Sequence, residues 1–374
     1  MAGQFLRKFT KTILLFCNGI TGLSLLLACY GSSINNGAYW FIGLFTLATI
    51  YLLIVSVLFF IFWLFAKPKL SLISLVFITI CFFPLKQIIP LRLSSFSIDR
   101  NPETTLRVMS WNVEHFDIIE HKIHPEVKTE MLEQINELNP DIACFQEMVA
   151  GDSLKKSINY LPEFQQKLKM PYHYYSYDRR LDFDRWHHFG IIIFSKYPIV
   201  NQKTIHADSL NYNSAFQYVD IVKNTDTFRV FNIHLQTLRF SIDNRKYLDN
   251  PAITGETDLL ESKNIIAKFK KGYIKRHRQS DWIKRALSKS PYPNILCGDF
   301  NDVPNSYAYN TIGKNMINTF VAKGAGIGNT FAGISPTLRI DNIFVDPRFD
   351  VQQYCRVKKK LSDHFPIVTD LKYK

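Results

Sequence analysis

The sequence predicts an α/β protein that follows a helical membrane region. Two observations support this organisation. Residues 1–99 contain a single acidic residue, Asp99, and several long runs without any charged side chain. Residues 104–374 instead alternate short segments rich in β-branched and aromatic residues with stretches whose apolar residues have helical spacing. A chain of 374 residues is long enough for a membrane region and one large domain.

Three apolar runs are candidates for transmembrane helices, at about residues 13–30, 38–66 and 70–89. The first two carry no charge and are long enough to cross a bilayer. The third is uncharged only over residues 70–85, so it reaches the length of a span if Lys86 extends its amine to the membrane surface. The chain therefore divides into a transmembrane region at residues 1–91, a linker at 92–103 and an α/β domain at 104–374.

The positions of the cations predict how the chain crosses the membrane. Arg7, Lys8 and Lys11 precede the first run, and Lys67 and Lys69 lie between the second and the third. The positive-inside rule then places the N-terminus in the cytoplasm. With three spans, the domain lies on the periplasmic or extracellular side of a bacterial inner membrane. With two spans, it faces the cytoplasm.

A second interpretation treats residues 1–29 as a cleaved signal sequence. They combine a basic start, an apolar middle and the ending "LLLAC", which resembles a lipoprotein cleavage site with Cys29 as the modified residue. Both interpretations leave the protein on a membrane. The six cysteines are too few and too scattered for a disulfide framework, and none has zinc-ligand spacing, so we expect small buried side chains.

The elements of the domain follow from the apolar patterning. A helix is expected around Met131, Leu132, Ile135 and Leu138, and a long one over residues 257–289. Strands are expected in eight apolar segments: "TLRVMSWNV", "PDIACFQE", "FGIIIFSKYPI", "FQYVDIV", "TFRVFNIHLQT", "NILCGDFN" and, near the end of the chain, "RIDNIFVD" and "FPIVTDLK".

Several of these strands finish, or nearly finish, on a residue able to hold a metal ion or a phosphate. These residues are Asn112, Glu147, His234, Asp299, Asn301, Asp341, Asp363 and His364. Each one alone has a simpler explanation, such as a turn residue or a buried histidine with a partner. Because ligands bind where strand ends gather in sheets of this kind, the set as a whole predicts one site.

The sequence resembles the endonuclease/exonuclease/phosphatase superfamily over roughly residues 104–374. The resemblance rests on "WN" at 111–112, "QE" at 146–147, "GIIIFSKYP" at 190–198, "HLQ" at 234–236, "GDFN" at 298–301, "RID" at 339–341 and "SDH" at 362–364. It implies a DNase I-like, four-layer α/β sandwich, in which two packed mixed β-sheets are flanked by helices. It also implies a magnesium-dependent phosphoester hydrolase.

The resemblance implies a role for each residue of the set. Glu147 is the first choice as metal ligand, with Asp363 as a second contact and Asn112 beside the metal or the phosphate. Asp299 would orient and deprotonate the attacking water. Asn301 and His364 would contact the phosphate, and Asp341 would fix the second ring nitrogen of His364.

His234 would lie near the leaving group, as the histidine of DNase-like and bacterial sphingomyelinase-like members does. Carboxylate and amide oxygens suit Mg²⁺, with Mn²⁺ as a substitute. One feature departs from the family pattern, because we identify no second glutamate to pair with this histidine. The segment "DRRLDFDRWHHFG" offers Asp182 or Asp184 for that role, three arginines at 179, 180 and 185, and His188; a solvated loop is the simpler interpretation.

The net positive charge of the domain favours a polyanionic substrate but does not indicate which polyanion. Residues 100–374 hold 38 Lys and Arg against 31 Asp and Glu. Much of the excess lies in residues 263–289, which suit a nucleic-acid backbone, anionic lipid headgroups or a solvated helix face with Ile265, Ile266 and Trp282 on the core side. Three hypotheses remain: a membrane-tethered nuclease, a lipid or inositol-phosphate hydrolase, and a catalytically silent binding protein. No protein partner can be inferred.

Overall fold

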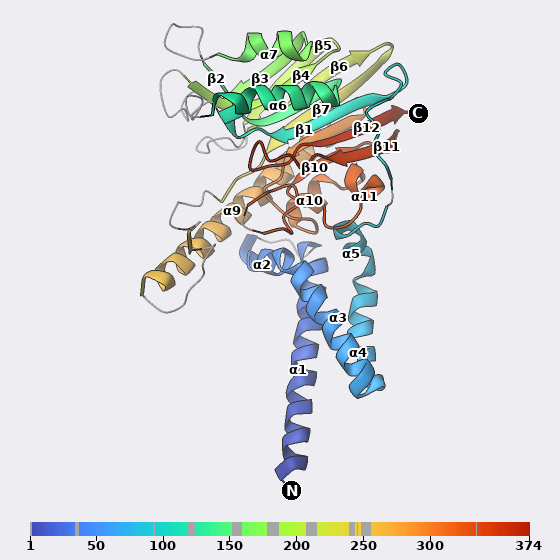
Figure 1. The fold of residues 1–374 in the computed structure, drawn as a ribbon, viewed down its shortest axis with the longest axis vertical. Helices are drawn as coiled ribbons and strands as arrows, with labels where there is room; N and C mark the ends of the chain where they lie inside the picture. Colours follow the sequence, from blue (N-terminus) through green and yellow to red (C-terminus); the bar gives the residue numbers. More distant parts are fainter. Residues whose placement is uncertain are drawn as a thin grey trace.

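Two six-stranded β-sheets pack face to face and stand on a bundle of apolar helices (Figure 1). The computed structural model describes residues 2–33, 37–92, 94–117, 124–151, 159–177, 187–206, 215–238, 244, 246–247, 256–333 and 335–374. In the first sheet the strand order is β11-β12-β1-β2-β4-β3. Its strands are β1 Leu106–Asn112, β2 Ile142–Gly151, β3 Tyr172–Tyr177, β4 His187–Ser195, β11 Phe349–Arg356 and β12 Ile367–Tyr373.

The second sheet has the strand order β5-β6-β7-β8-β10-β9. Its strands are β5 Ile199–His206, β6 Ala215–Lys223, β7 Asp226–His234, β8 Asn294–Asp299, β9 Ile317–Asn318 and β10 Asp341–Val345. Both sheets are mixed, since β1 pairs with β2, and β7 with β8, in parallel, while the other pairs are antiparallel.

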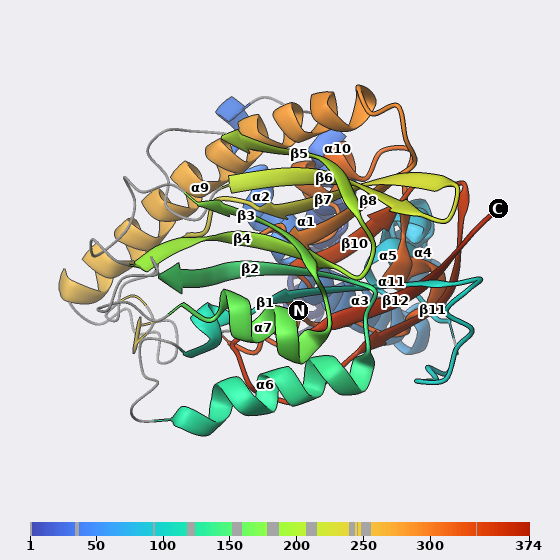
Figure 2. The same cartoon turned by 90° about the horizontal axis from the view of Figure 1, so that it is seen from above.

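Helices cover the outer faces of both sheets (Figure 2). Helices α6 Pro125–Leu138 and α7 Leu161–Leu168 pack on the first sheet, while α9 Glu256–Ser288 and α10 Tyr307–Ile312 pack on the second. The short helix α11 Thr319–Lys323 lies beside β10 and β11. Buried apolar side chains such as Val108, Ile193 and Ile295 fill the space between the sheets. The predicted four-layer sandwich is therefore confirmed.

Some elements differ from the prediction. "FGIIIFSKYPI", predicted as one strand, is two: β4 ends at Ser195 and β5 begins at Ile199, in the other sheet. Ser195 marks the crossing, because its Oγ accepts the N–H of Tyr197 at 3.0 Å and closes a turn. Strands β3, β9 and β11 were not predicted. Their sequences are short or mix polar with apolar residues, so they lack a strong strand pattern.

The first part of the chain is helical. It consists of α1 Ala2–Tyr30, η1 Gly31–Ser33, η2 Gly37–Tyr39, α2 Ile42–Leu47, α3 Thr49–Ala66, α4 Pro68–Ile80 and α5 Phe82–Ile88. Within the described part of the chain, two helices are long and apolar enough to cross a membrane, Gly3–Ser33 and Thr49–Ala66. The pair Pro68–Ile80 and Phe82–Ile88 makes a third span if it is counted as one helix bent by 62°. The sequence predicted each of these apolar runs.

Two of the predicted spans differ in detail. Residues 38–66 are not one helix, because the short η2 and α2 precede α3 and pack against α9. Gly43 permits this contact, since a Cβ there would lie 2.7 Å from the ring of Tyr273. The third run bends at Cys81, three residues before Pro84, whose ring excludes a regular helix around Ile80. The hydroxyl of Tyr30 donates to the Ile80 carbonyl at 2.6 Å at this break.

Arg339 joins α5, at the end of the third apolar run, to the second sheet. Its guanidinium is buried and donates to the carbonyls of Ile88 at 2.9 Å and Gln87 at 2.7 Å, at the C-terminal end of α5. It also donates to the Ile327 carbonyl at 3.1 Å. A cation at a helix C-terminus satisfies free carbonyls and complements the helix dipole. The apolar helices are thus attached to the residue that lies two positions before Asp341.

A buried ion pair holds the far end of the first sheet. Arg107 on β1 is fully buried and contacts both oxygens of Asp370 on β12, at 2.7 and 2.8 Å. The remaining guanidinium donors reach the carbonyls of Leu138 at 2.9 Å and Ile98 at 3.1 Å. The charge is therefore compensated within the core, and removal of one partner leaves the other buried without a counter-charge.

We expect Asp370→Asn to lower stability by about 3–5 kcal/mol, because Arg107 then remains charged and buried without its partner. The melting temperature of the full chain in detergent should fall by roughly 10 °C. Asp350→Asn is the matched control, since Asp350 on β11 is exposed and should change the melting temperature very little. Equal melting temperatures for both variants would contradict the importance of the pair.

Candidate active site

The parallel strand pairs deliver polar side chains to one edge of the two sheets. In the first sheet, Asn112 at the end of β1 lies opposite Gln146 on β2. In the second, His234 at the end of β7 lies opposite Asp299 at the end of β8. The carboxyl ends of parallel strands share one edge, which brings together residues far apart in the sequence.

The glycine of "GDFN" permits the close pairing of β7 and β8. Gly298 has φ +148°, and a Cβ at this position would lie 2.0 Å from the carbonyl oxygen of Ile233. Only glycine fits there without moving a strand. Asn301 then turns the chain in a left-handed conformation with φ 47°. Its backbone N–H donates to Asp299 Oδ1 at 2.7 Å, and its Nδ2 donates to Asp299 Oδ2 at 3.1 Å.

A β-bulge directs Glu147 to the same edge. The pairing of β2 with β4 shifts register between Phe145 and Met148, and Glu147 has φ 53° within this irregularity. A bulge inserts an extra residue and re-aims its side chain. Gln146 points into the space between the sheets, where its Nε2 donates to Asn232 Oδ1 at 2.7 Å. Glu147 is partly exposed and lies over the site.

Asp341 reaches this edge at the start of its strand, not at its end as the sequence suggested. Strand β10 runs antiparallel to β8, so Asp341 lies opposite Asp299. His364 comes from the segment before β12, and its backbone forms a bridge with Phe331. Trp111 Nε1 donates to the His364 carbonyl at 2.9 Å, which fixes the position of the histidine.

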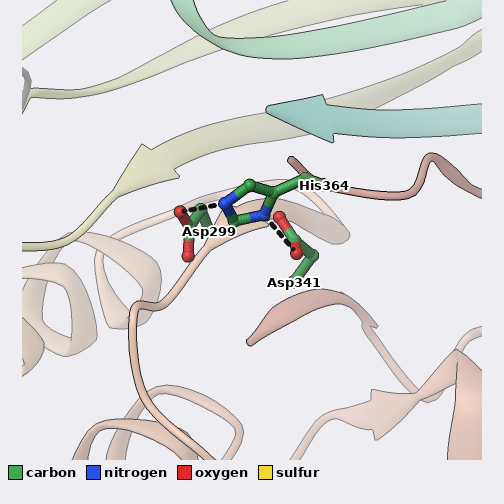
Figure 3. A group of neighbouring side chains, drawn as sticks. All are labelled: Asp299, Asp341 and His364. Atoms are coloured by element: carbon green, nitrogen blue, oxygen red, sulfur yellow. Dashed lines mark hydrogen bonds and ion pairs between the residues drawn. The ribbon is translucent and has the colours of Figure 1, made fainter. Parts of the chain in front are cut away.

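Asp299 and Asp341 lie on opposite sides of the His364 ring (Figure 3). Asp299 contacts several residues of the site. Its Oδ2 accepts from Asn112 Nδ2 at 3.2 Å and lies 3.8 Å from His364 Nε2. The other ring nitrogen of His364, Nδ1, is 2.8 Å from Asp341 Oδ2. One imidazole therefore lies between two buried carboxylates, and the aspartate on Nδ1 fixes its orientation.

The positive charge of His364 and the negative charges of Asp299 and Asp341 stabilise one another. Burial alone would lower the pKa of His364, but the charges of Asp341 and Asp299 raise it well above its usual value. Burial would raise the pKa of Asp299, yet the charge of His364 and the contact with His234 lower it. At neutral pH, therefore, His364 carries a proton and Asp299 is a carboxylate.

His234 lies between Asp299, which belongs to the second sheet, and Glu147, which belongs to the first. Its Nε2 is 3.5 Å from Asp299 Oδ2 and 3.7 Å from Glu147 Oε1. The side chain is buried, and neither ring nitrogen has a hydrogen-bond partner at normal distance within the described residues. Burial would lower the pKa of His234, but the contact with Asp299 and the charge of Glu147 raise it.

The turn after β1 adds two residues that the sequence analysis did not select. Residues 114–117 all have positive φ, between 42° and 64°, which non-glycine residues rarely adopt. Glu114 Oε2 accepts the backbone N–H of Asp363 at 2.9 Å, and His115 Nε2 lies 3.6 Å from Glu147 Oε2. The only signal in the sequence is their position just after Asn112, in "WNVEHFD".

Glu114, Glu147 and Asp363 form a carboxylate cluster in which the charges of Glu147 and Asp363 act on Glu114. Burial raises the pKa of Glu114, and the charges of Asp363 and Glu147 raise it further. A divalent cation among these oxygens would relieve that repulsion, and magnesium is held by one or two carboxylates in this way.

Among the described residues, Asp299, Asp341 and His364 offer ligand atoms within 4.8 Å of one another and could hold a metal ion. Here the histidine already compensates both carboxylates through its Nδ1 and Nε2. A cation at this place would compete with a protonated imidazole.

All eight residues predicted from the sequence lie around this edge, linked by the contacts above. The alternative residues at 179, 180, 182, 184 and 185 lie outside the described residues. His188, proposed as a residue near the site, is buried in β4, and its ring stacks on Tyr177 at 4.5 Å between centroids.

The fold and the site together define a class, the DNase I-like hydrolases of phosphoester bonds. The chain belongs to the Endonuclease/Exonuclease/phosphatase family, whose model matches residues 109–364. A second family model, described only as a domain of unknown function, matches residues 11–88. No curated protein matches the chain.

Several solved structures share the fold. An endonuclease/exonuclease/phosphatase family protein from Leptotrichia buccalis is 16% identical, with a TM-score of 0.50 over 72% of this chain and 100% of its own. The endonuclease/exonuclease/phosphatase from Bacteroides vulgatus is 17% identical, with the same TM-score and coverage. A functionally unknown conserved protein from Enterococcus faecalis is 14% identical, again with a TM-score of 0.50, 72% and 100%. At these identities the likeness shows the fold alone.

We expect Glu114→Gln and Glu147→Gln each to weaken binding of Mn²⁺ by at least about tenfold, because each removes a charge from the carboxylate cluster. Titration of the purified full chain followed by electron paramagnetic resonance of free Mn²⁺ measures this. Glu163→Gln, at a surface ion pair with Lys128 and Lys167, should leave the affinity unchanged. A loss of affinity in Asp341→Asn alone would instead locate the ion between Asp299, Asp341 and His364.

Proposed function

We propose that this chain is a membrane-anchored, Mg²⁺-dependent phosphodiester hydrolase, with nucleic acid as its first candidate substrate. The observation that carries the proposal is the buried Asp299–His364–Asp341 group lying beside the carboxylate cluster of Glu114, Glu147 and Asp363. The Asp299–His364–Asp341 group can transfer protons, and the carboxylate cluster can bind a cation. Hydrolysis of a phosphodiester needs both, since the substrate repels nucleophiles and has a poor leaving oxygen.

The residues of the site divide the work as follows. Asp299 orients the attacking water and accepts its proton as the bond to phosphorus forms. Because its pKa is lowered, Asp299 is a weak base until the water begins to attack. Asn112 and Asn301 already donate to Asp299 and hold it in place. A metal ion on Glu147 and Asp363 would neutralise phosphate charge.

The two histidines serve the phosphate and the leaving group. His364 is protonated and donates from Nε2 to a phosphoryl oxygen, while Asp341 holds its Nδ1–H. His234 has no close hydrogen-bond partner among the described residues, so its Nε2 can serve as the donor to the leaving oxygen. The retention of this whole set argues against a catalytically silent binding protein.

The apolar helices support anchoring in a bacterial inner membrane. With α4 and α5 counted as one bent span, three crossings and the positions of Arg7, Lys67 and Lys69 favour a catalytic domain on the periplasmic side. With two crossings the domain would face the cytoplasm.

A lipid or inositol-phosphate hydrolase is the second candidate. It is favoured by the contact of α9 with the short helix α2, where Gly43 lies against Tyr273 and Phe269. The domain therefore stands on the end of the apolar bundle, with α9, α10 and α11 in contact with it (Figure 1). An enzyme held this close to a bilayer can reach a headgroup phosphate.

We expect purified protein to cleave a bis-nitrophenyl phosphodiester with Mg²⁺ and to lose this activity in EDTA, with Mn²⁺ as a partial substitute. Asp299→Ala and His364→Ala should each lower turnover by about 10²–10⁴-fold, since they remove a proton acceptor and a donor to the phosphate. His124→Ala and Asp350→Ala, at exposed positions, are the matched controls. Unaltered melting curves would show that the losses are not due to unfolding.

The same preparation should be tested on plasmid DNA, RNA, sphingomyelin and phosphoinositides. Cleavage of DNA or RNA supports the first candidate. Cleavage of lipid with DNA intact would reject the nuclease and leave the hydrolase. Activity on no substrate, despite bound Mn²⁺, would support the silent binding protein.

We expect a reporter that is active only in the periplasm to be active when fused at the C-terminus, because three crossings carry the domain outward. A cytoplasm-dependent reporter at the same position should be silent. The opposite result would mean that the bent pair α4 and α5 does not cross the membrane.

A further inference from the structure

The N-terminal half of α9 extends beyond the domain that it covers. From Phe269 onwards the helix is attached by buried residues, among them Tyr273, Arg276 and Ile283. Before Phe269 the described positions are partly or fully exposed. Figure 1 shows this half slanting away from the sheets, towards the level of α2 at the upper end of the apolar bundle.

Three contacts show which face of α9 looks towards the bundle. Lys270 Nζ lies 5.7 Å from the ring of Trp40, between η2 and α2. Tyr273 lies against Gly43, and Ile274 lies nearest to Gly37. These residues belong to the end of the apolar region that adjoins the domain. The face of α9 centred near Lys270 is therefore its membrane-facing side.

The same face continues to the N-terminus of the helix. Leu259, Lys263, Ile266 and Lys270 are spaced by four, three and four residues, so they fall within a band of about 60° on the helix surface. All four are exposed, Leu259 to 50% and Ile266 to 46%. The sequence had suggested that Ile266 and Trp282 face the core, and both prove exposed, Trp282 to 37%.

The neighbouring elements expose apolar side chains at the same level. Tyr39 and Phe41 are 47% and 42% exposed, and Leu44 and Leu47 on α2 are similar. Aromatic residues gather at the boundary between hydrocarbon and headgroups. The apolar residues of η2 and α2 thus continue the surface of the bundle towards the stripe Leu259, Lys263, Ile266 and Lys270.

We propose that this stripe of α9 lies on the bilayer and binds anionic lipid headgroups. Leu259 and Ile266 enter the boundary of the acyl chains, while Lys263 and Lys270 contact phosphate oxygens. Helices of this kind combine a lysine-rich face with apolar anchors and lie in the plane of the interface. The proposal rests on the proposed membrane anchoring but not on any particular substrate.

Hydrogen–deuterium exchange of the full chain in nanodiscs tests the proposal. Amides of residues 259–270 should exchange more slowly in discs that contain about one third phosphatidylglycerol than in pure phosphatidylcholine discs. Lys263→Glu should reduce this extra protection by about fivefold, since one surface lysine contributes about 1 kcal/mol to binding of an anionic membrane. Arg285→Glu, an exposed cation at the other end of α9, should retain it.

The double variant Leu259→Asn/Ile266→Asn should lose protection in both kinds of disc, because it removes the apolar anchors. Equal exchange of residues 259–270 in detergent and in both discs would overturn the proposal. Equal effects of Lys263→Glu and Arg285→Glu would do so as well. Failure of the chain to enter discs at all would instead reject the membrane anchoring, and elution together with the discs reports this separately.

Discussion

The site depends on a hydrogen bond between the two sheets, directly beneath it. Gln146 Nε2 on β2 donates to Asn232 Oδ1 on β7 at 2.7 Å, and Asn232 Nδ2 donates to carbonyls of Phe145 and Ile192 at 2.9 Å. Both amides are fully buried. An unpaired amide there would cost about 1–3 kcal/mol, so the sheets are favoured in this one relative position. That position brings Asn112 and Glu147 to His234 and Asp299.

Because the two sheets are held in this position, the site can contain several charged side chains with little access to water. Asp299, Asp341 and His364 are buried side by side, and each would be costly alone. Their mutual attraction keeps Asp299 ionised and His364 protonated. Glu114, Glu147 and Asp363 lie beside this group, with His364 Nε2 3.8 Å from Asp363 Oδ1 and His234 Nε2 3.7 Å from Glu147 Oε1. Burial and the charges of Asp363 and Glu147 still raise the pKa of Glu114.

The sequence predicted the two-sheet fold and most strands because their apolar runs are long and end on polar residues. It could not show that Asp341 begins its strand, since antiparallel pairing with β8 is a matter of topology. The sequence analysis did not select Glu114 and His115, because a left-handed turn of four non-glycine residues has no sequence pattern. The break between α2 and α3 was missed for a similar reason: residues 38–66 carry no charge, and no residue type marks the end of a helix between Leu47 and Thr49.

The attachment of the domain to the apolar helices depends on packing, not on the length of the segment between them. The backbone of Arg92 donates to the Gly324 carbonyl at 3.1 Å, and that of Ser97 donates to Gln353 Oε1 at 2.8 Å, so both residues are held on the domain surface. Arg339 holds the end of α5. Because Asp341 follows two residues later and orients His364, a tilt of α5 would act on the strand that carries this aspartate. The contact that fixes the domain on its helices is therefore also part of the support of the site.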